Sequence, residues 1–592
     1  MIHVKDHKQL DMFNPFGHLG VKRLALLESS WAHTFREEIL HKLPVEKLFP
    51  FYDELQGRKS KELYAMLGLI IIQQMEDCTD QDAVDNFALN LKWQYALNVT
   101  DASDFAAYVS PRTLWKVRDI VARKDLQDSL FENVTDTLAK LFSLDPSKQR
   151  LDSVHIFSNM AHLGRIRLFV RTIRKFLVNL KRHHADLYQD LGEVAVRYEE
   201  KNDGRFAVKP SDSTRTLQEV GDDCFCLVER FKEHQAVRDM ASYKLLVRLF
   251  GEQCVVEKTD AKSAVVIKPN KEVPSDSLQN PSDPDATFCG HKGKGYQMQV
   301  EETYSPDKSQ PNLITHVKVE AAHESDANAL IPAIEDAAKR GLAPKELLAD
   351  SLYGSDDNVE KAKEFGVELV SPTMGSQTNK IGLADFTFSG SDEIIACPEG
   401  QKPHRIKTGK QGGKIVHFDK AVCDLCPRQS DCPTKRVKLS VSISYDAKEL
   451  RLSRRRIKEK TEEFRDTYRY RAGVEGTMSD LDRITGLKHL RARGMPQVRL
   501  AAVLKATGLN ILRSEAFKNR LRRQKKAEMR PEPSADRLFG AINEQLRRVR
   551  DVLWGTIFGI AIKRSAMADL LLPPADRIRE GISGEYVGFF YR

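Results

Sequence analysis

The stretch KQRLDSVHIFSN, residues 148–159, decides the fold. A long helical pattern precedes it, and the alternation of apolar and polar residues from Leu151 to Ile156 is typical of a core β-strand. Asp152 lies in the middle of this strand. A carboxylate inside an otherwise apolar strand costs free energy unless it is hydrogen-bonded, paired or bound to a metal. The stretch therefore predicts a buried strand that carries a partnered or functional aspartate.

The same alternation returns further along the chain. The expected elements are a strand in GYQMQVEETYS (295–305), a strand in NLITHVKVEAA (312–322), a helix in SDANALIPAIEDAAKRG (325–341), and a short buried strand in KELLADSLYGS (345–355) that stops at Asp350. Strand, strand, strand, helix, strand is the order of an RNase H-like core. The predicted fold class is therefore α/β, with an RNase H-like core.

The remaining segments divide the chain into domains, as 592 residues exceed what one core holds. The predicted domains are a helical N-terminal DNA-binding or dimerisation domain (1–148), the core (149–160 and 285–395), a helical insertion with a linker (161–284), a small β-rich, zinc-ribbon-like insertion (396–446), helices that complete the core (447–516) and a basic C-terminal tail (517–592).

Composition and charge favour a globular protein with a polyanionic partner. Apolar residues are 41% of the chain and charged residues 30%, and 93 Lys+Arg against 84 Asp+Glu give a net charge of +9. Basic residues cluster in RIRLFVRTIRKF (165–176), RLSRRRIKEK (451–460) and KNRLRRQKK (518–526). Such clusters suit DNA, whose counterions are released on binding, although solvated helix faces have the same composition.

The expected location is the bacterial cytoplasm, in association with the nucleoid. The longest apolar stretch, MLGLIII (66–72), is much shorter than the ~20 residues that a bilayer requires. The N-terminus has no apolar signal core. The nine cysteines lack the pattern of a small secreted domain, which indicates a reducing compartment.

Three carboxylates form the candidate catalytic and metal-binding set: Asp152, Asp350 and Glu475. Phosphoryl transfer on DNA can use two Mg²⁺ (or Mn²⁺) ions about 3.5–4 Å apart, held by hard oxygen ligands. Carboxylates on a strand, at a strand end and on an adjacent helix would supply these ligands. The alternative for each residue is an ordinary hydrogen-bonded side chain, and the sequence separations alone do not decide between the two.

Local context adds a family resemblance. QRLDSVHIFSNMAHLGR resembles the first-aspartate strand of bacterial insertion-sequence DDE transposases, LLADSLYGSDDNVEKAKEFGVELVSP is similar to their second-aspartate segment, and YRYRAGVEGTMSDLDRITGLKHLRARG is similar to their glutamate helix. Residues from about Gly57 to Val121 resemble their amino-terminal domain. The resemblance implies that Asp152, Asp350 and Glu475 are the catalytic triad.

Around the glutamate, the family pattern is Tyr, two residues, Arg, three residues, Glu, six residues, Lys. Tyr468, Arg471 and Glu475 match it, and their spacing would place them on one helix face. The resemblance implies that Tyr468 and Arg471 contact DNA. Asp482 stands where the family has Lys, and the adjacent Arg483 is the candidate for that phosphate contact.

Four cysteines form a candidate structural zinc site: Cys397, Cys423, Cys426 and Cys432. Cys-x-x-Cys presents two thiolates to one tetrahedral ion, and the outer two cysteines would complete it. His404 or His417 could replace one of them, and four reduced thiols without metal are the alternative.

The expected function is that of a DNA transposase, which cleaves the terminal inverted repeats of its element and transfers the freed strand into target DNA. Work on paired ends implies at least a homodimer on DNA. Two alternatives remain: a catalytically silent DNA-binding regulator derived from a transposase, and a metal-dependent nuclease without strand transfer.

Overall fold

The computed structural model describes residues 1–9, 15–53, 56–199, 206–259, 262–375, 380–409, 412–436, 440–528 and 544–549. The chain divides into two units, Met1–Asn519 and Arg520–Arg592. Most of the predicted basic tail (517–592) lies beyond residue 528 and outside the described residues.

The N-terminal region is helical, as predicted. Its helices are α1 (Val21–Glu28), α2 (Trp31–Thr34), α3 (Leu63–Met75), α4 (Asp80–Leu89), α5 (Leu91–Ala96), α6 (Asp104–Ala107), α7 (Pro111–Arg123) and α8 (Leu126–Leu141). Ser110 caps α7 by accepting from the Thr113 N–H at 3.3 Å, with Pro111 at the first helical position. Asn90 separates α4 from α5, and its side chain caps α5 by accepting from the Lys92 N–H at 3.0 Å.

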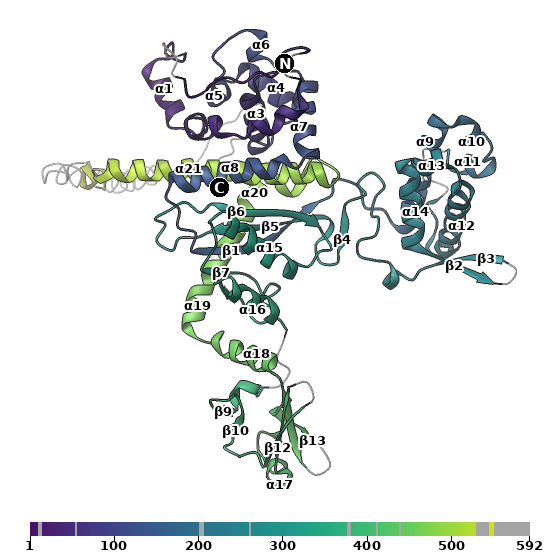
Figure 1. Cartoon of the computed structure of the whole chain (residues 1–592), viewed down its shortest axis with the longest axis vertical. Coiled ribbons are helices and arrows are strands. Elements are labelled where there is room, and N and C mark those ends of the chain that lie inside the picture. Colours follow the sequence, from purple (N-terminus) through teal and green to yellow (C-terminus); the bar gives the residue numbers. More distant parts are fainter. Residues whose placement is uncertain are drawn as a thin grey trace, which may run out of the picture. The chain divides into compact units, whose positions relative to one another are not determined.

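A six-stranded mixed sheet forms the centre of the fold (Figure 1). Its strands are β1 (Lys148–Phe157), β4 (Thr287–Cys289), β5 (Gly293–Thr303), β6 (Ile314–Ala321), β7 (Glu346–Leu348) and β8 (Glu368–Val370). β5 pairs antiparallel with β1, and both β4 and β6 pair with β5. On its other side β1 pairs parallel with β7, and β7 with β8. The order β6-β5-β1-β7-β8 is that of the predicted core.

Helices cover both faces of this sheet. One face packs against helices of the C-terminal part, α20 (Gly473–Thr485) and α21 (Met495–Glu528), through a cluster that includes Val154 and Leu481. The other packs against α15 (Leu330–Lys339) and α16 (Asp356–Glu364) through a cluster that includes Leu151. Because side chains alternate along a strand, the two faces of β1 enter two different cores.

The segment between β1 and β4 has a core of its own. It contains α9 (Arg165–His183), α10 (Ala185–Gln189), α11 (Glu193–Arg197), α12 (Ser213–Phe231), α13 (Gln235–Arg238), α14 (Ala241–Gln253), β2 (Cys254–Thr259) and β3 (Lys262–Ile267). The helical insertion was predicted, but the β2–β3 hairpin was not. The segment predicted as a linker is packed against the rest of the protein. Its Asp283 is fully buried and accepts from Tyr296 at 2.6 Å, Ser158 at 2.6 Å and the Gly494 N–H at 3.0 Å.

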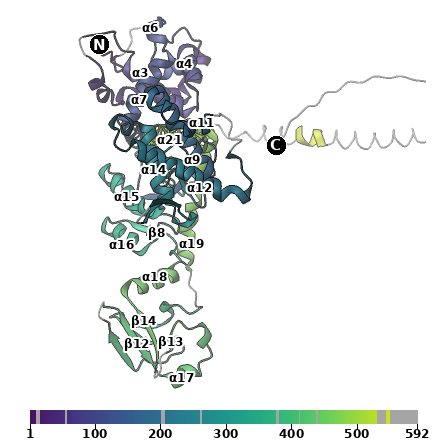
Figure 2. The same ribbon diagram turned by 90° about the vertical axis from the view of Figure 1, so that its right-hand side faces the viewer.

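Residues 387–445 form two small sheets. They consist of β9 (Thr387–Phe388), β10 (Ile394–Ala396), β11 (Arg405–Thr408), β12 (Lys414–Phe418), α17 (Lys420–Asp424), β13 (Lys435–Arg436) and β14 (Val441–Tyr445). β10 pairs with β9, and the larger sheet has the order β11-β12-β14-β13; Figure 2 shows β12, β13 and β14 with α17. The β-rich character of the cysteine segment was thus predicted.

The chain then returns to helix in α18 (Ala447–Lys458), α19 (Glu462–Tyr468), a 3-10 turn (Arg469–Ala472), α20 and α21. The basic cluster 451–460 makes ion pairs within the protein: Arg451 with Asp356 at 2.5 Å, Arg454 with Asp392 at 2.5 Å and Lys458 with Glu368 at 2.8 Å. Much of this cluster's charge is therefore already matched. No helix among the described residues combines the length and apolar character that a membrane crossing requires.

Candidate active site

Asp152 lies in the middle of β1, on the face that α20 covers. Its side chain alternates with that of Leu151 and points the same way as those of Val154 and Ile156, which pack against Val474 of α20. The Asp152 side chain is 15% exposed. Burial raises the pKa of its carboxyl, the guanidinium of Arg471 opposes this shift, and the charge of Asp350 adds to it.

Asp350 lies beside Asp152 because of the register between two parallel strands. Arg150 of β1 pairs with Leu348 of β7, and the two aspartates each follow two residues later. Adjacent strands are about 4.8 Å apart, so the two carboxylates leave the sheet next to each other. Asp350 Oδ1 accepts from the Leu352 N–H at 2.8 Å, which holds its carboxylate at the strand end.

Glu475 is in the first turn of α20, and Arg471 connects it to Asp152. The Arg471 guanidinium donates to Asp152 Oδ2 at 2.8 Å and to Glu475 Oε1 at 3.2 Å. It therefore stands between the two carboxylates. Among the described residues, no three His, Cys, Asp or Glu side chains lie close enough together to hold a metal ion. Arg471 thus contacts Asp152 and Glu475, and the three predicted carboxylates do not form a metal-binding group as they stand.

A buried ionic network docks α20 on the sheet. Glu302 of β5 is fully buried; it accepts from Arg150 at 2.7 Å, from Arg513 of α21 at 2.7 Å and from the Thr477 hydroxyl of α20 at 2.7 Å. Gly473 lets the helix come this close, since a Cβ there would meet Arg150 Nη1 at 2.0 Å. Sequence reasoning missed this network, although a glutamate pair in the apolar β5 was its signal.

A second network lies beside Asp152. Lys292 Nζ donates to Ser153 Oγ at 3.0 Å and is 3.9 Å from the buried Asp326. Gln299 donates to Asp326 at 2.8 Å and accepts from the Tyr353 hydroxyl at 2.5 Å. Burial and the nearby carboxylates raise the pKa of Tyr353 well above its usual value. Because Ser153 alternates with Asp152 along β1, these five side chains lie on the opposite face of that strand, toward α15 and α16.

The other predicted DNA contacts fall in different places. Tyr468 ends α19, is half-buried and stacks on Phe464 with ring centroids 5.4 Å apart. Burial raises its pKa, and nearby Arg471 opposes the shift. Arg483 is eight residues beyond Glu475, about 12 Å along the helix, and its guanidinium pairs with Asp480 at 3.1 Å. Asp482 accepts from the Lys488 N–H at 3.3 Å. The structure therefore does not bring Arg483 to the carboxylates.

The four cysteines line one cleft of about 720 Å³ in the β-rich segment. Burial raises the pKa of the Cys423 thiol, and the other three cysteines raise it further. The Cys426 N–H donates to Cys423 O at 3.3 Å, which makes the turn expected of Cys-x-x-Cys. His417 bonds Ser440 at 3.0 Å. The thiols share a site, but as they stand they do not form a metal-binding group.

Two family models match the chain. One describes a transposase DDE domain and matches residues 396–514, and the other describes a transposase domain and matches residues 28–119. Both matches support an insertion-sequence DDE transposase. No curated protein matches this transposase. The DDE match includes the four cysteines, Arg471 and Glu475, and the N-terminal match covers α2 to α6 and most of α7.

The RNase H-like core that a DDE domain implies agrees with the transposase's sheet order. The strands that carry Asp152 and Asp350 lie outside both matched ranges. The strand register relates Asp350 to Asp152, and the Arg471 contacts relate Asp152 to Glu475.

Proposed function

We propose that the transposase cleaves DNA at the ends of its element and joins the freed 3′ end to target DNA, with Asp152, Asp350 and Glu475 as the catalytic carboxylates. The observation that supports this proposal is the parallel register of β1 and β7, in which Arg150 pairs with Leu348, two residues before each aspartate. Arg471 adds a contact with both Asp152 and Glu475. An aspartate pair on one sheet, with a third carboxylate on an adjoining helix, is a donor set of hard oxygens suited to Mg²⁺ or Mn²⁺.

The donor set fits divalent cations on electrostatic grounds. Two neighbouring carboxylates repel each other, and burial makes the charged form of Asp152 costly. A positive group is needed there, and Arg471 provides one. Two bound ions would supply activation of the attacking hydroxyl and stabilisation of the leaving oxygen. Lys292 and Arg471 would place cationic groups beside a phosphate held at this site.

We also propose DNA contacts for this chain by analogy with the family. Tyr468, next to the acidic pair, would contact the DNA end, and Arg471 a phosphate. Arg483, on the exposed end of α20, would contact DNA farther from the reaction centre. Action on two element ends requires two copies of the transposase on DNA, and the nucleoid in the cytoplasm is where such DNA lies.

The test is Mg²⁺-dependent or Mn²⁺-dependent nicking of DNA that contains the element's ends. Asp350→Asn should lose nicking by at least a thousandfold while it still binds this DNA. Asp357→Asn is the matched control, because its side chain is 74% exposed and outside the site. Nicking unchanged in Asp350→Asn would refute the assignment. Nicking without joined product, tested with pre-cleaved ends, would favour a nuclease, and DNA binding without nicking a regulator.

We also propose that Cys397, Cys423, Cys426 and Cys432 hold one structural zinc ion. Four thiols that line the same cleft support this, since four sulfurs complete a tetrahedral zinc site after modest rearrangement. Purified transposase should contain one zinc per chain, measured by elemental analysis. Cys426→Ser should lose it, and Cys226→Ser, at an exposed cysteine of α12, should keep it. A zinc-free wild-type protein would contradict the proposal.

A further inference from the structure

A second cleft, of about 500 Å³, lies where the N-terminal helices meet the loop after α20. Its lining comes from the end of α3, the start of α4, the middle of α7, the loop residues 490–493 and α21. It contains none of the candidate catalytic carboxylates. Its size is within the range of about 300–1,000 Å³ that is usual for small-ligand sites.

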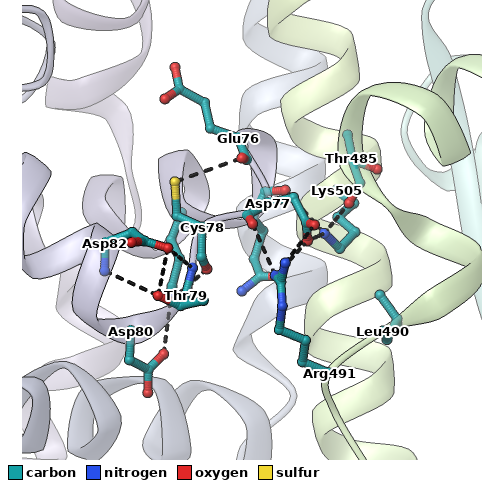
Figure 3. Close-up of polar contacts among 12 residues, drawn as sticks. Glu76, Asp77, Cys78, Thr79, Asp80, Asp82, Thr485, Leu490, Arg491 and Lys505 are labelled. Carbon is teal, nitrogen blue, oxygen red and sulfur yellow. Dashed lines mark hydrogen bonds and ion pairs between the residues drawn. The ribbon is translucent and has the colours of Figure 1, made fainter. Parts of the chain in front are cut away.

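The floor of this cleft is a fixed ionic cluster centred on Asp77. Arg491 donates to the two Asp77 carboxylate oxygens at 3.0 and 3.1 Å, and Lys505 Nζ donates to Oδ1 at 2.7 Å (Figure 3). The Lys505 side chain is 2% exposed and also donates to the backbone oxygen of Thr485, in the last turn of α20. Asp77 adopts a left-handed backbone (φ 50°) to reach these groups. The cluster therefore ties the cleft to the helix that carries Glu475.

The cleft has more positive than negative groups. Its lining contains four cations, Arg118, Arg491, Arg493 and Lys505, and two carboxylates, Asp77 and Asp80. Arg118 pairs with Asp80 at 2.8 Å, which uses the second carboxylate. The Arg493 guanidinium bonds a neutral amide oxygen, that of Asn159, at 2.8 Å. Two positive charges therefore remain for an anionic ligand, with Arg493 the cation whose observed partner is uncharged.

An exposed tryptophan lines the same cleft. Trp115 of α7 is 49% exposed, although its neighbours Leu114 and Val117 are buried in the helical core. Trp31 and Trp93, the other tryptophans among the described residues, are buried. An indole face in the same cleft as a guanidinium whose partner is uncharged is an arrangement on which proteins stack a nucleobase while they hold its phosphate.

We propose that this cleft binds one unpaired nucleotide of the DNA substrate, with the base against Trp115 and the phosphate at Arg493 and Arg491. The inference rests on the proposed function, which supplies DNA as the partner. A duplex is too wide for a cleft of this size, whereas a single extruded or single-stranded nucleotide fits. Through Lys505 and Thr485, an occupied cleft contacts the element that positions Glu475.

Binding of a mixed-sequence single-stranded 12-mer to the full chain, followed by fluorescence anisotropy, tests the proposal. Trp115→Ala should weaken binding roughly tenfold through lost stacking. Arg493→Ala should lower the slope of log affinity against log salt by about 0.7, the value of one phosphate contact on a single strand. Trp115→Phe should recover most of the affinity. Arg123→Ala is the control, since it removes an exposed cation from the same helix outside the cleft.

A 12-mer with abasic sites separates stacking from charge. Trp115→Ala and wild type should bind it equally, because no base remains to stack. If both cleft variants are folded by circular dichroism and bind the 12-mer as well as wild type, the cleft does not bind a nucleotide. The proposed transposase function would not be affected by that result. Equal weakening on abasic and normal strands would also overturn the nucleotide assignment. If the wild-type protein did not bind DNA, the proposed function itself would be refuted.

Discussion

Two adjacent glutamates of β5 should respond in opposite ways to the same substitution. Glu301 and Glu302 are both fully buried, on opposite faces of the sheet. Glu302→Gln removes the carboxylate that two arginines share, Arg150 and Arg513. Loss of one partner from a buried ionic network leaves charges without compensation and costs about 3–5 kcal/mol. The free energy of unfolding should fall by this amount at neutral pH, and α20 should lose its attachment.

The Glu301 carboxyl has no hydrogen-bond partner among the described residues, and burial raises its pKa to about 8. In the unfolded chain the group titrates near ~4.3. Between these values the folded state keeps a proton that the unfolded state has lost, so stability falls as pH rises from roughly 4 to 8. At about 1.4 kcal/mol per pH unit the loss is a few kcal/mol in total. Glu301→Gln should remove this pH dependence and stabilise the sheet above pH 7.

Hydrogen exchange of peptides that cover β5, at pH 6 and pH 8 with intrinsic rates corrected, measures the opening free energy of this sheet. Glu302→Gln should open more readily at both values. Glu301→Gln should be more protected than wild type at pH 6, and the difference should be larger at pH 8. Glu324→Gln, a 45% exposed control, should change neither. The reasoning distinguishes a buried carboxylate that has ion-pair partners, Glu302, from a buried carboxyl without hydrogen-bond partners, Glu301. It would be wrong if Glu301→Gln lost as much protection as Glu302→Gln at pH 8.

Three shorter predictions concern the site and its scaffold. Gly473→Ala should displace α20 from Arg150, with a stability loss of about 1–3 kcal/mol and a loss of nicking; unchanged calorimetry would show that the helix has room. Lys292→Ala should slow nicking roughly tenfold to a hundredfold at saturating DNA, and Lys292→Arg should recover most of it; equal rates in both variants would remove Lys292 from the site. Ser110→Ala should cost about 1 kcal/mol in thermal unfolding, since the Thr113 N–H loses its cap; no shift would mean that water replaces it.

Local patterns explain why much of the fold was predictable. Apolar periodicity within each segment predicts β1, β5, β6, β7 and α15. Ser110, as an N-cap residue, indicates the start of α7. Asp152 and Asp350 were predicted as candidates for the same reason, because a carboxylate in or directly after an apolar strand is visible in a few neighbouring residues.

Contacts between distant segments explain what was missed. The pairing of Arg150 with Leu348 joins residues almost two hundred positions apart, and no local pattern encodes it. Arg451 and its neighbours were expected to favour DNA because their partners, such as Asp356, lie on another element. Arg471 was expected to contact phosphate, whereas in this structure it bridges two carboxylates. In each case the sequence shows one member of a pair, and only the fold supplies the other.

The long segment between β1 and β5 has a consequence for synthesis on the ribosome. These two strands pair directly, yet 135 residues separate Phe157 from Gly293. At about 5–20 residues per second, the nascent β1 waits roughly 7–27 s before its partner has been translated. The intervening helices have their own core and can fold during that interval. The apolar strand that bears Asp152 is therefore open to chaperones, or to aggregation, in every newly made copy.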